Sequence, residues 1–303
     1  MSIPTATYRK DRLTAMNQFT LQQRKMIAYL VMAATVLIVI CLVAALTLGV
    51  IALVRSGDDE GEQPDVDNND VDTEAPNGDD TPSIPTAKPS RVLGATADMG
   101  QAYIDSMIFV GESTTAHLRS RGVLTGGKST KQVWSNESNT MALDLNILQK
   151  TINYPETGQA MTIPAAAAVA RPKYIVLNFG VNGIQTFGKN EKLYSTAYGK
   201  LIDAIHEASP DTVVLLQTVY PVAANQATFH EGAATINGYI KRLNELLPDI
   251  ATAHNAYVVD TASVLVGSDG NLRSDYQTGD GIHLTTEAYV QILNYLRTHG
   301  YTN

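Results

Sequence analysis

The chain has 303 residues and a mass of 32.6 kDa, and its 22 Lys and Arg against 30 Asp and Glu give a formal net charge of −8. This charge divides into +5 on residues 1–55, −11 on residues 56–80 and −2 on residues 81–303. The last segment is nearly neutral, which excludes a typical nucleic-acid-binding domain, because such domains need surplus Lys and Arg to neutralise phosphates. The single cysteine, Cys41, excludes an intramolecular disulfide and a cysteine-based zinc cluster.

Residues 26–54 contain no charged side chain. A helix of this length would extend roughly 43 Å and could cross the roughly 30 Å hydrocarbon layer of a bilayer. The apolar part of a cleaved signal peptide is shorter. Five Lys and Arg precede the segment and only Arg55 directly follows it, which is typical of a cytoplasmic N-terminus. We therefore predict a cytoplasmic tail over residues 1–25, an uncleaved transmembrane helix over 26–54 and an extracellular location for the rest of the chain.

Residues 55–92 are acidic, rich in Pro, Asn and Gly, and poor in large apolar side chains. Such a composition buries too little surface to offset the entropy of ordering, so we predict a disordered extracellular linker. Its run 65–70 resembles the start of a calcium-binding EF-hand loop. However, Asp70 and Pro76 stand where that loop needs Gly and Glu, so we expect no metal there.

Residues 93–303 alternate short β-rich runs with longer amphipathic stretches. The strands 174–179 and 212–219 are apolar enough to be covered on both faces, which is typical of a parallel sheet between two layers of helices. We predict a three-layer α/β/α sandwich with a central parallel five-stranded sheet. In chain order the expected elements are strand 107–110, helix 114–121, strand 131–134, helix 139–151, strand 174–179, helix 193–208, strand 212–219, helix 232–253, strand 257–260 and helix 286–299.

Polar and glycine residues follow the expected strands, at the edge of a parallel sheet where ligands bind. A serine hydroxyl becomes an effective nucleophile when a histidine takes its proton, and a carboxylate can hold that histidine in one tautomer. Attack on an ester also needs donors for the negative oxygen that forms, such as a backbone N–H at a helix start or a side-chain amide. The segments after the strands contain Gly111, Ser113, Ser135, Asn136, Gly180, Asn182, Asp280 and His283, and together they supply a hydroxyl, an amide, a carboxylate and an imidazole.

Three of these segments carry a family resemblance. The run IFVGESTT at 108–115, the Gly180-x-Asn182 pattern and the Asp280-x-x-His283 pattern are similar to the SGNH/GDSL hydrolase family, in its order and spacing from about residue 107 to 300. The resemblance implies a flavodoxin-like sandwich and an esterase, lipase, carbohydrate O-deacetylase or O-acetyltransferase activity without a cofactor. It further implies that Ser113 is the nucleophile, His283 the base and Asp280 its partner. The Ser113 N–H and Asn182 would form part of the oxyanion hole, with Gly111 and Gly180 supporting the site.

The chain departs from the family pattern at three places. Glu112 replaces the Asp of the Gly-Asp-Ser motif, and Gly183 stands where an Asp often follows the oxyanion Asn. The glycine expected after the second strand, normally the third oxyanion donor, has no obvious equivalent in the run VWSNES at 133–138. We expect the backbone N–H of Ser135 or Asn136 to take its place.

Two further features need an interpretation. His117 lies four residues after Ser113 and is a rival imidazole, but no carboxylate is near it in sequence, so we expect a solvent-exposed helix residue. Residues 122–129 match the phosphate-binding pattern G-x-x-x-x-G-K-S. That mechanism requires a strand before the loop and a helix after it, and here the order is reversed. We therefore expect a helix-to-strand turn and no nucleotide partner.

Together these observations predict a membrane-anchored extracellular serine esterase, of a bacterial type, that acts on small acyl esters. O-acetyl groups on a cell-wall or surface carbohydrate are the expected substrate. Two alternatives stay open: an O-acyltransferase that uses the same three residues, and a glycan-binding module whose catalytic site has degenerated.

Overall fold

The computed structural model describes residues 91–302. The predicted cytoplasmic tail, the predicted transmembrane helix and nearly all of the predicted linker lie outside the described residues. Within 91–302, no helix combines the length and the apolar character needed to cross a bilayer.

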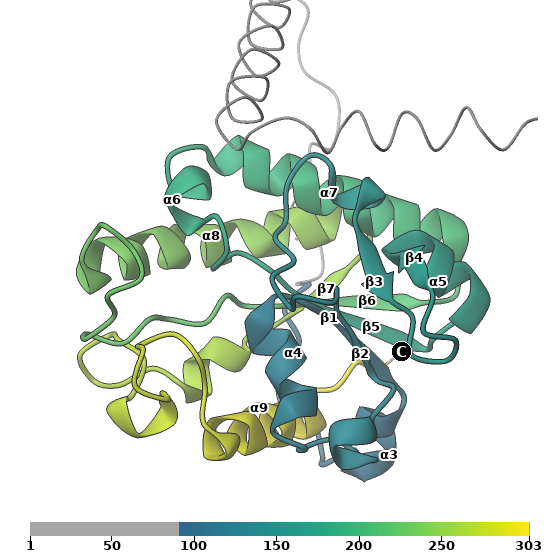
Figure 1. Ribbon diagram of the computed structural model, residues 1–303, viewed down its shortest axis with the longest axis horizontal. Helices are drawn as coiled ribbons and strands as arrows, with labels where there is room; N and C mark the ends of the chain where they lie inside the picture. The colour runs from purple at the N-terminus through teal and green to yellow at the C-terminus, as the bar shows by residue number, and fades with distance from the viewer. Residues whose placement is uncertain (1–90, 303) are drawn as a thin grey trace, which may run out of the picture. The chain divides into compact units, whose positions relative to one another are not determined.

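A five-stranded parallel sheet forms the centre of the described domain (Figure 1). Its strands lie in the order β2-β1-β5-β6-β7. The expectation of a central parallel five-stranded sheet is thus confirmed. The strand bounds are β1 Met107–Gly111, β2 Val133–Trp134, β5 Tyr174–Asn178, β6 Val213–Gln217 and β7 Tyr257–Val259.

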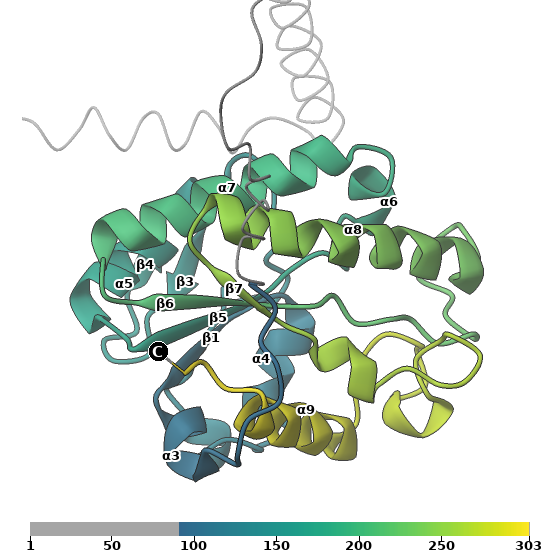
Figure 2. The same ribbon diagram turned by 180° about the vertical axis from the view of Figure 1, so that it is seen from behind.

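Helices cover both faces of this sheet, as Figures 1 and 2 show from opposite sides. Successive strand side chains point to opposite faces, so Ile175 and Leu177 pack into one apolar core while Val176 packs into the other. The first core is completed by α5 Ile163–Ala170, α6 Ile184–Phe187, α7 Glu191–Ala208 and α8 Ala233–Ala253. The second is completed by α3 Gly100–Asp105, α4 Ser113–Ser120 and α9 Thr286–Thr298.

The helix expected over residues 139–151 is wrong. This segment is irregular, with a short 3₁₀ turn at Ile147–Gln149 and then the strand β3 Thr151–Asn153, which pairs antiparallel with β4 Ala160–Thr162. Side chains here bind their own backbone: Asp144 Oδ1 accepts the N–H of Asn146 at 2.8 Å, and Asn136 Oδ1 accepts the N–H of Thr140 at 2.9 Å. Such local bonds compete with helix formation.

The strand order brings two chain segments together at the point where the direction in which the chain adds strands to the sheet reverses. From β1 the chain passes to the edge strand β2, and it then returns to β5 on the other side of β1. Gly111 is paired with Asn178 in the register of these two neighbours. A Cβ atom at Gly111 would lie 2.3 Å from the Asn178 carbonyl oxygen and 2.3 Å from Thr115 Oγ1, so only glycine fits. Ligands bind at such switch points in open α/β sheets.

The other edge of the sheet is covered by the first described residues. The N–H of Val258 in β7 donates to the carbonyl of Arg91, and the N–H of Leu93 donates to the carbonyl of Val258, both at 2.8 Å. Val92 therefore forms a one-residue parallel bridge with Val258.

Candidate active site

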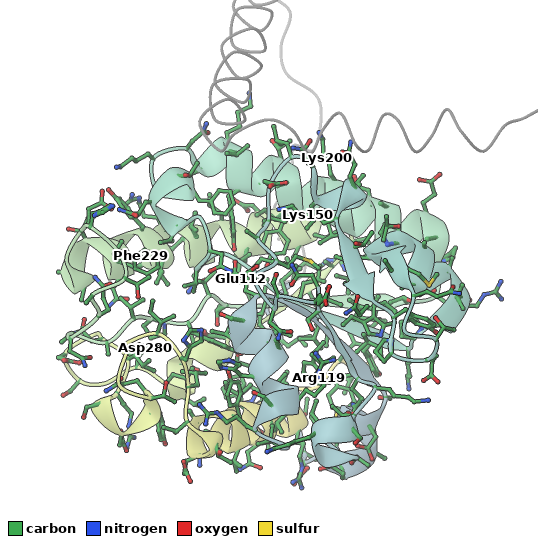
Figure 3. The ribbon with its side chains drawn as sticks, in the orientation of Figure 1. Glu112, Arg119, Lys150, Lys200, Phe229 and Asp280 are labelled. Carbon is green, nitrogen blue, oxygen red and sulfur yellow. The ribbon has the colours of Figure 1, made fainter. Side chains whose placement is uncertain are left out.

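The predicted nucleophile, base and carboxylate lie together at the switch point. Ser113 is the first residue of α4, directly after β1, and its Oγ lies 2.9 Å from Nε2 of His283. Nδ1 of the same ring lies 2.5 Å from Oδ2 of Asp280. Figure 3 shows Asp280 on the loop that precedes α9. The three side chains form a continuous chain of hydrogen-bonding atoms that runs from a hydroxyl to a carboxylate.

The loop carrying Asp280 is held by its own hydrogen bonds. Asp280 Oδ1 accepts the N–H of Ile282 and the N–H of His283, each at 2.9 Å, while Oδ2 contacts the ring. Partial burial raises the pKa of Asp280, but the bonds from the His283 ring and the two N–H groups outweigh it and lower the pKa to about 2. Asp280 is therefore a carboxylate at neutral pH and can hold the imidazole in one tautomer.

Glu112, the residue before Ser113, connects the start of α4 to the segment after β5. Its side chain is buried, Oε1 accepts the N–H of Gly180 at 2.8 Å and Oε2 accepts the N–H of Asn182 at 2.9 Å. Burial raises the pKa of Glu112 to about 7, against the opposing effect of the N–H groups of Gly180, Asn182 and Val181. Glu112, which replaces the Asp of the family motif, thus fixes the main chain at Gly180 and at Asn182. The sequence marked this position, but not its contacts.

Asn182 is held at its side chain as well as its main chain. Nδ2 donates to the carbonyl of Met141 at 3.3 Å, which leaves the second amide hydrogen for another acceptor. The adjacent Gly183 has φ of 97°, a left-handed conformation that favours glycine, and it is the N-cap residue directly before α6. The left-handed backbone conformation at position 183 therefore explains why Gly stands there in place of the Asp of the family pattern.

Ser135 is buried just after β2 and its hydroxyl is already bonded. Oγ accepts from Nη2 of Arg119 at 2.9 Å and donates to Oδ1 of Asn139 at 2.8 Å. Any contribution of Ser135 to oxyanion binding must therefore come from its backbone N–H. Its hydroxyl instead connects α4 to the loop after β2.

His117 is not the exposed residue that we expected. It is half-buried, and its ring centroid lies 4.7 Å from that of His283 with an interplanar angle of 44°. Burial lowers the pKa of His117, and the neighbouring His283 lowers it further. Nδ1 is buried and lacks a hydrogen-bond partner in residues 91–302. His117 therefore packs against the predicted base as a neutral ring, because helix spacing places it under the C-terminal loop.

The segment 122–129 is a helix-to-strand turn, as predicted. α4 ends at Ser120, a 3₁₀ turn covers Gly127–Ser129, and β2 follows. The order required for a phosphate loop is therefore not met. Within the described part of the chain, no group of three or more His, Cys, Asp or Glu residues could hold a metal ion.

Lys150 fixes the loop that holds the Asn182 amide. Its Nζ donates to the carbonyl of Ala142 at 2.6 Å and pairs with Asp144 at 2.7 Å, next to the Met141 carbonyl that accepts from Asn182. These contacts join α6 and the irregular loop into one rim of the site. Sequence reasoning missed Lys150, because its target is a backbone carbonyl in a segment predicted to be helical.

If Asn182 is the oxyanion donor that the sequence predicts, we expect Asn182→Ala to lower kcat for an acetyl ester by about 100-fold with little change in KM. Lys150→Ala is expected to lower kcat by about tenfold by releasing the Asn182 side chain. The measurement is steady-state kinetics with 4-nitrophenyl acetate, and Lys131→Ala, which breaks an exposed ion pair with Glu156, is the matched control.

A double variant separates positioning from general damage. If Lys150 acts through Asn182, then Lys150→Ala should cost almost nothing further when Asn182 is already Ala. Full additivity of the two losses would contradict this role for Lys150.

Comparison with known protein families assigns the chain by its sequence. The family described as GDSL-like lipase/acylhydrolase matches residues 109–290, more than half of the chain. A search of curated proteins gives no significant match.

Solved structures with partial similarity to this chain include the following three. A Streptococcus pneumonia protein named for platelet activating factor has 18% identity, with 63% of this chain and 82% of that chain covered and a TM-score of 0.46. A GDSL-like lipase from Bacteroides thetaiotaomicron has 18% identity, with 66% and 90% covered and a TM-score of 0.40. A peptidoglycan O-acetylesterase has 11% identity, with 44% and 38% covered and a TM-score of 0.34. At these low scores it is the family match, over the same residues that carry the Ser, Asn and His motifs, that decides the assignment. The chain therefore belongs to the GDSL-like lipase/acylhydrolase family and is an SGNH-type serine hydrolase that acts on ester bonds.

Proposed function

We propose that Ser113, His283 and Asp280 are the catalytic residues and that the enzyme removes small acyl groups, in particular O-acetyl groups, from carbohydrate. The observation that carries the proposal is the continuous contact from Ser113 Oγ through the His283 ring to Asp280, at 2.9 Å and 2.5 Å. In this mechanism the Ser113 hydroxyl attacks the ester carbonyl carbon while its proton moves to Nε2 of His283. Asp280 stabilises the imidazolium that forms.

Two donors are proposed to receive the developing negative oxygen. They are the N–H of Ser113, at the positive end of α4, and the free hydrogen of the Asn182 amide. When the C–O bond breaks, the leaving alkoxide takes the proton from His283, and an acyl group remains on Ser113. Water then gives a proton to His283 as it attacks the acyl carbon, and release of the acid restores the hydroxyl.

Solvent access supports hydrolysis over transfer. The side chain of His283 is 30% exposed and that of Asp280 is 44% exposed, so water reaches the base directly. The apolar cavity of about 500 Å³ beside α8 and β7 is lined by residues that include neither Ser113 nor His283, so it is not positioned as a pocket for a long chain. The choice of carbohydrate as the alcohol rests on the predicted extracellular location.

The test is product analysis with the purified full chain and an O-acetylated oligosaccharide, in water and with a second oligosaccharide present as acceptor. We expect free acetate as the product in both reactions. Acetate appearing mainly on the added acceptor would instead favour the acyltransferase, and binding of the oligosaccharide without any release would favour the degenerate glycan-binding module.

We further propose that residues 26–54 anchor the enzyme with its N-terminus in the cytoplasm. The support is the uncharged 29-residue segment and the basic residues before it. Protease added to intact cells should release the esterase domain, and full protection of the domain would contradict this orientation.

A further inference from the structure

A second cavity, lined by both polar and apolar residues, extends to Gln277, three residues before Asp280. Its volume is about 430 Å³, and it lies between the segments 223–225 and 267–277. These segments belong to the loop after β6 and the loop before α9, which lie next to each other on the left of Figure 1. Leu272 joins them, because its N–H donates to the carbonyl of Val222 at 3.0 Å. The cavity is thus built by two segments that are fixed to each other.

The same residues that line the cavity hold the catalytic loop. Gln277 Oε1 accepts the N–H of Gly279 at 2.6 Å and the N–H of Gly281 at 3.1 Å, on either side of Asp280. Ala223, on the other wall, donates its N–H to the carbonyl of Gly281 at 2.8 Å. The loop that carries Asp280 and His283 is therefore held directly by two residues of the cavity lining, Gln277 and Ala223.

The charged groups of the cavity are already paired within the protein. The Arg273 guanidinium donates to both oxygens of Asp275, at 3.0 and 2.7 Å, and the two oxygens of Asp269 accept from the main chain and side chain of Asn271, at 3.1 and 2.9 Å. These bonds leave no unpaired cation for an anionic ligand. The carboxylates of the lining also outnumber its single guanidinium, which disfavours phosphates and acidic chains.

Neutral hydrogen-bonding groups remain free in the same cavity. Within residues 91–302, the side chains of Asn225, Ser268 and Ser274 and the Nε2 of Gln277 make no hydrogen bond. Ala223 and Leu272 add a buried apolar surface beneath them. Amides and hydroxyls above a small apolar floor match the hydroxyls and C–H faces of a sugar.

We propose that this cavity, the 223–277 pocket, binds the sugar units of a neutral oligosaccharide whose acyl ester lies at Ser113. This inference rests on the proposed deacylation and extends it by naming where the alcohol part of the substrate is held. The pocket favours oligosaccharide esters because it binds their sugar units. Loss of the pocket therefore raises KM for an oligosaccharide ester. A small ester without a sugar does not reach the pocket and is unaffected.

The test compares two substrates with one double variant of the full chain. Asn225→Ala with Ser268→Ala is expected to lower kcat/KM for acetylated xylotetraose or acetylated chitotetraose, whichever is the better substrate, by about tenfold or more through KM. Hydrolysis of 4-nitrophenyl acetate should stay within about twofold. The matched control is Ser120→Ala with Asn294→Ala, two exposed polar residues outside the pocket lining. An equal loss on both substrates, or no loss on either, would overturn the pocket.

A binding measurement tests the proposed pocket independently of catalysis. Ser113→Ala should bind xylotetraose or N-acetylated chitotetraose, each without O-acetyl groups, in calorimetry, and adding the pocket substitutions should abolish that heat. Absence of binding by both sugars at about 10 mM overturns the pocket even if the acetyl esterase is active. If Ser113→Ala retains full esterase activity while the sugar still binds, the proposed catalytic role of Ser113 fails and the pocket stands.

Discussion

Ser113→Ala and His283→Ala are each expected to lower kcat for 4-nitrophenyl acetate by about 10⁴-fold or more. The first removes the only atom that can carry the acyl group in the proposed mechanism, and the second removes the group that accepts its proton at 2.9 Å. Because the two side chains act as one unit, the double variant should be scarcely slower than either single variant. The free energy of unfolding should change by no more than about 1 kcal/mol, since both side chains are partly solvent-exposed.

The measurement combines steady-state kinetics with covalent labelling. A phosphonate serine probe should label the wild-type chain at Ser113 and leave Ser113→Ala unlabelled. Ser120→Ala, at the other end of α4, and His230→Ala, an exposed residue, are the controls and should retain wild-type rates. Retention of more than about a tenth of the rate by Ser113→Ala would exclude it as the nucleophile.

Glu112→Gln is expected to change both the pH dependence of stability and the rate. The pKa of Glu112 is raised from 4.5 to about 7 in the folded chain, so its protonated form is favoured by folding. Its contribution to stability is therefore fully present below pH 4.5 and is lost as the pH rises to about 7. Over that interval the wild type should lose about 3 kcal/mol of unfolding free energy relative to Glu112→Gln, which has no titrating group there.

The rate should fall because glutamine cannot replace both acceptors. Its amide nitrogen is a donor, so either the N–H of Gly180 or that of Asn182 loses its partner and the Asn182 amide moves. We expect kcat to fall by about 10- to 100-fold. Urea denaturation between pH 4 and 8 and kinetics at pH 7.5 test both effects, with Glu137→Gln at an exposed site as the control. Parallel stability curves for Glu112→Gln and wild type would show that another group titrates.

The sheet and the positions of the site residues could be predicted because they depend on local pattern and a general rule of topology. The apolar runs at β5 and β6 are typical of buried strands. Parallel strands end at the same edge of a sheet, which brings the residues after β1 and β5 together. The hydrogen bonds that hold the site residues in place depend instead on the direction in which each side chain points. Glu112 meets Gly180 and Asn182 across almost seventy residues, and no sequence pattern indicates that pairing.

The segment 139–151 shows that a local pattern can also predict the wrong secondary structure. Its apolar residues suggest a helix, but Met141 and Leu143 are buried at alternate positions while Asp144 bonds the main chain ahead of it. His117 was misjudged for a related reason. Its surroundings are set by the loop 279–283, which approaches from the far end of the chain, so local sequence carries no information about its burial.

The bridge between Val92 and β7 decides where a shortened chain can begin. A recombinant fragment that starts at residue 94 would lose both partners of Val258 and would leave β7 as a bare outer strand. Unpaired outer strands promote association with neighbouring molecules. A fragment made for crystallisation or assay should therefore start upstream of Arg91, so that residues 91–93 remain paired with β7.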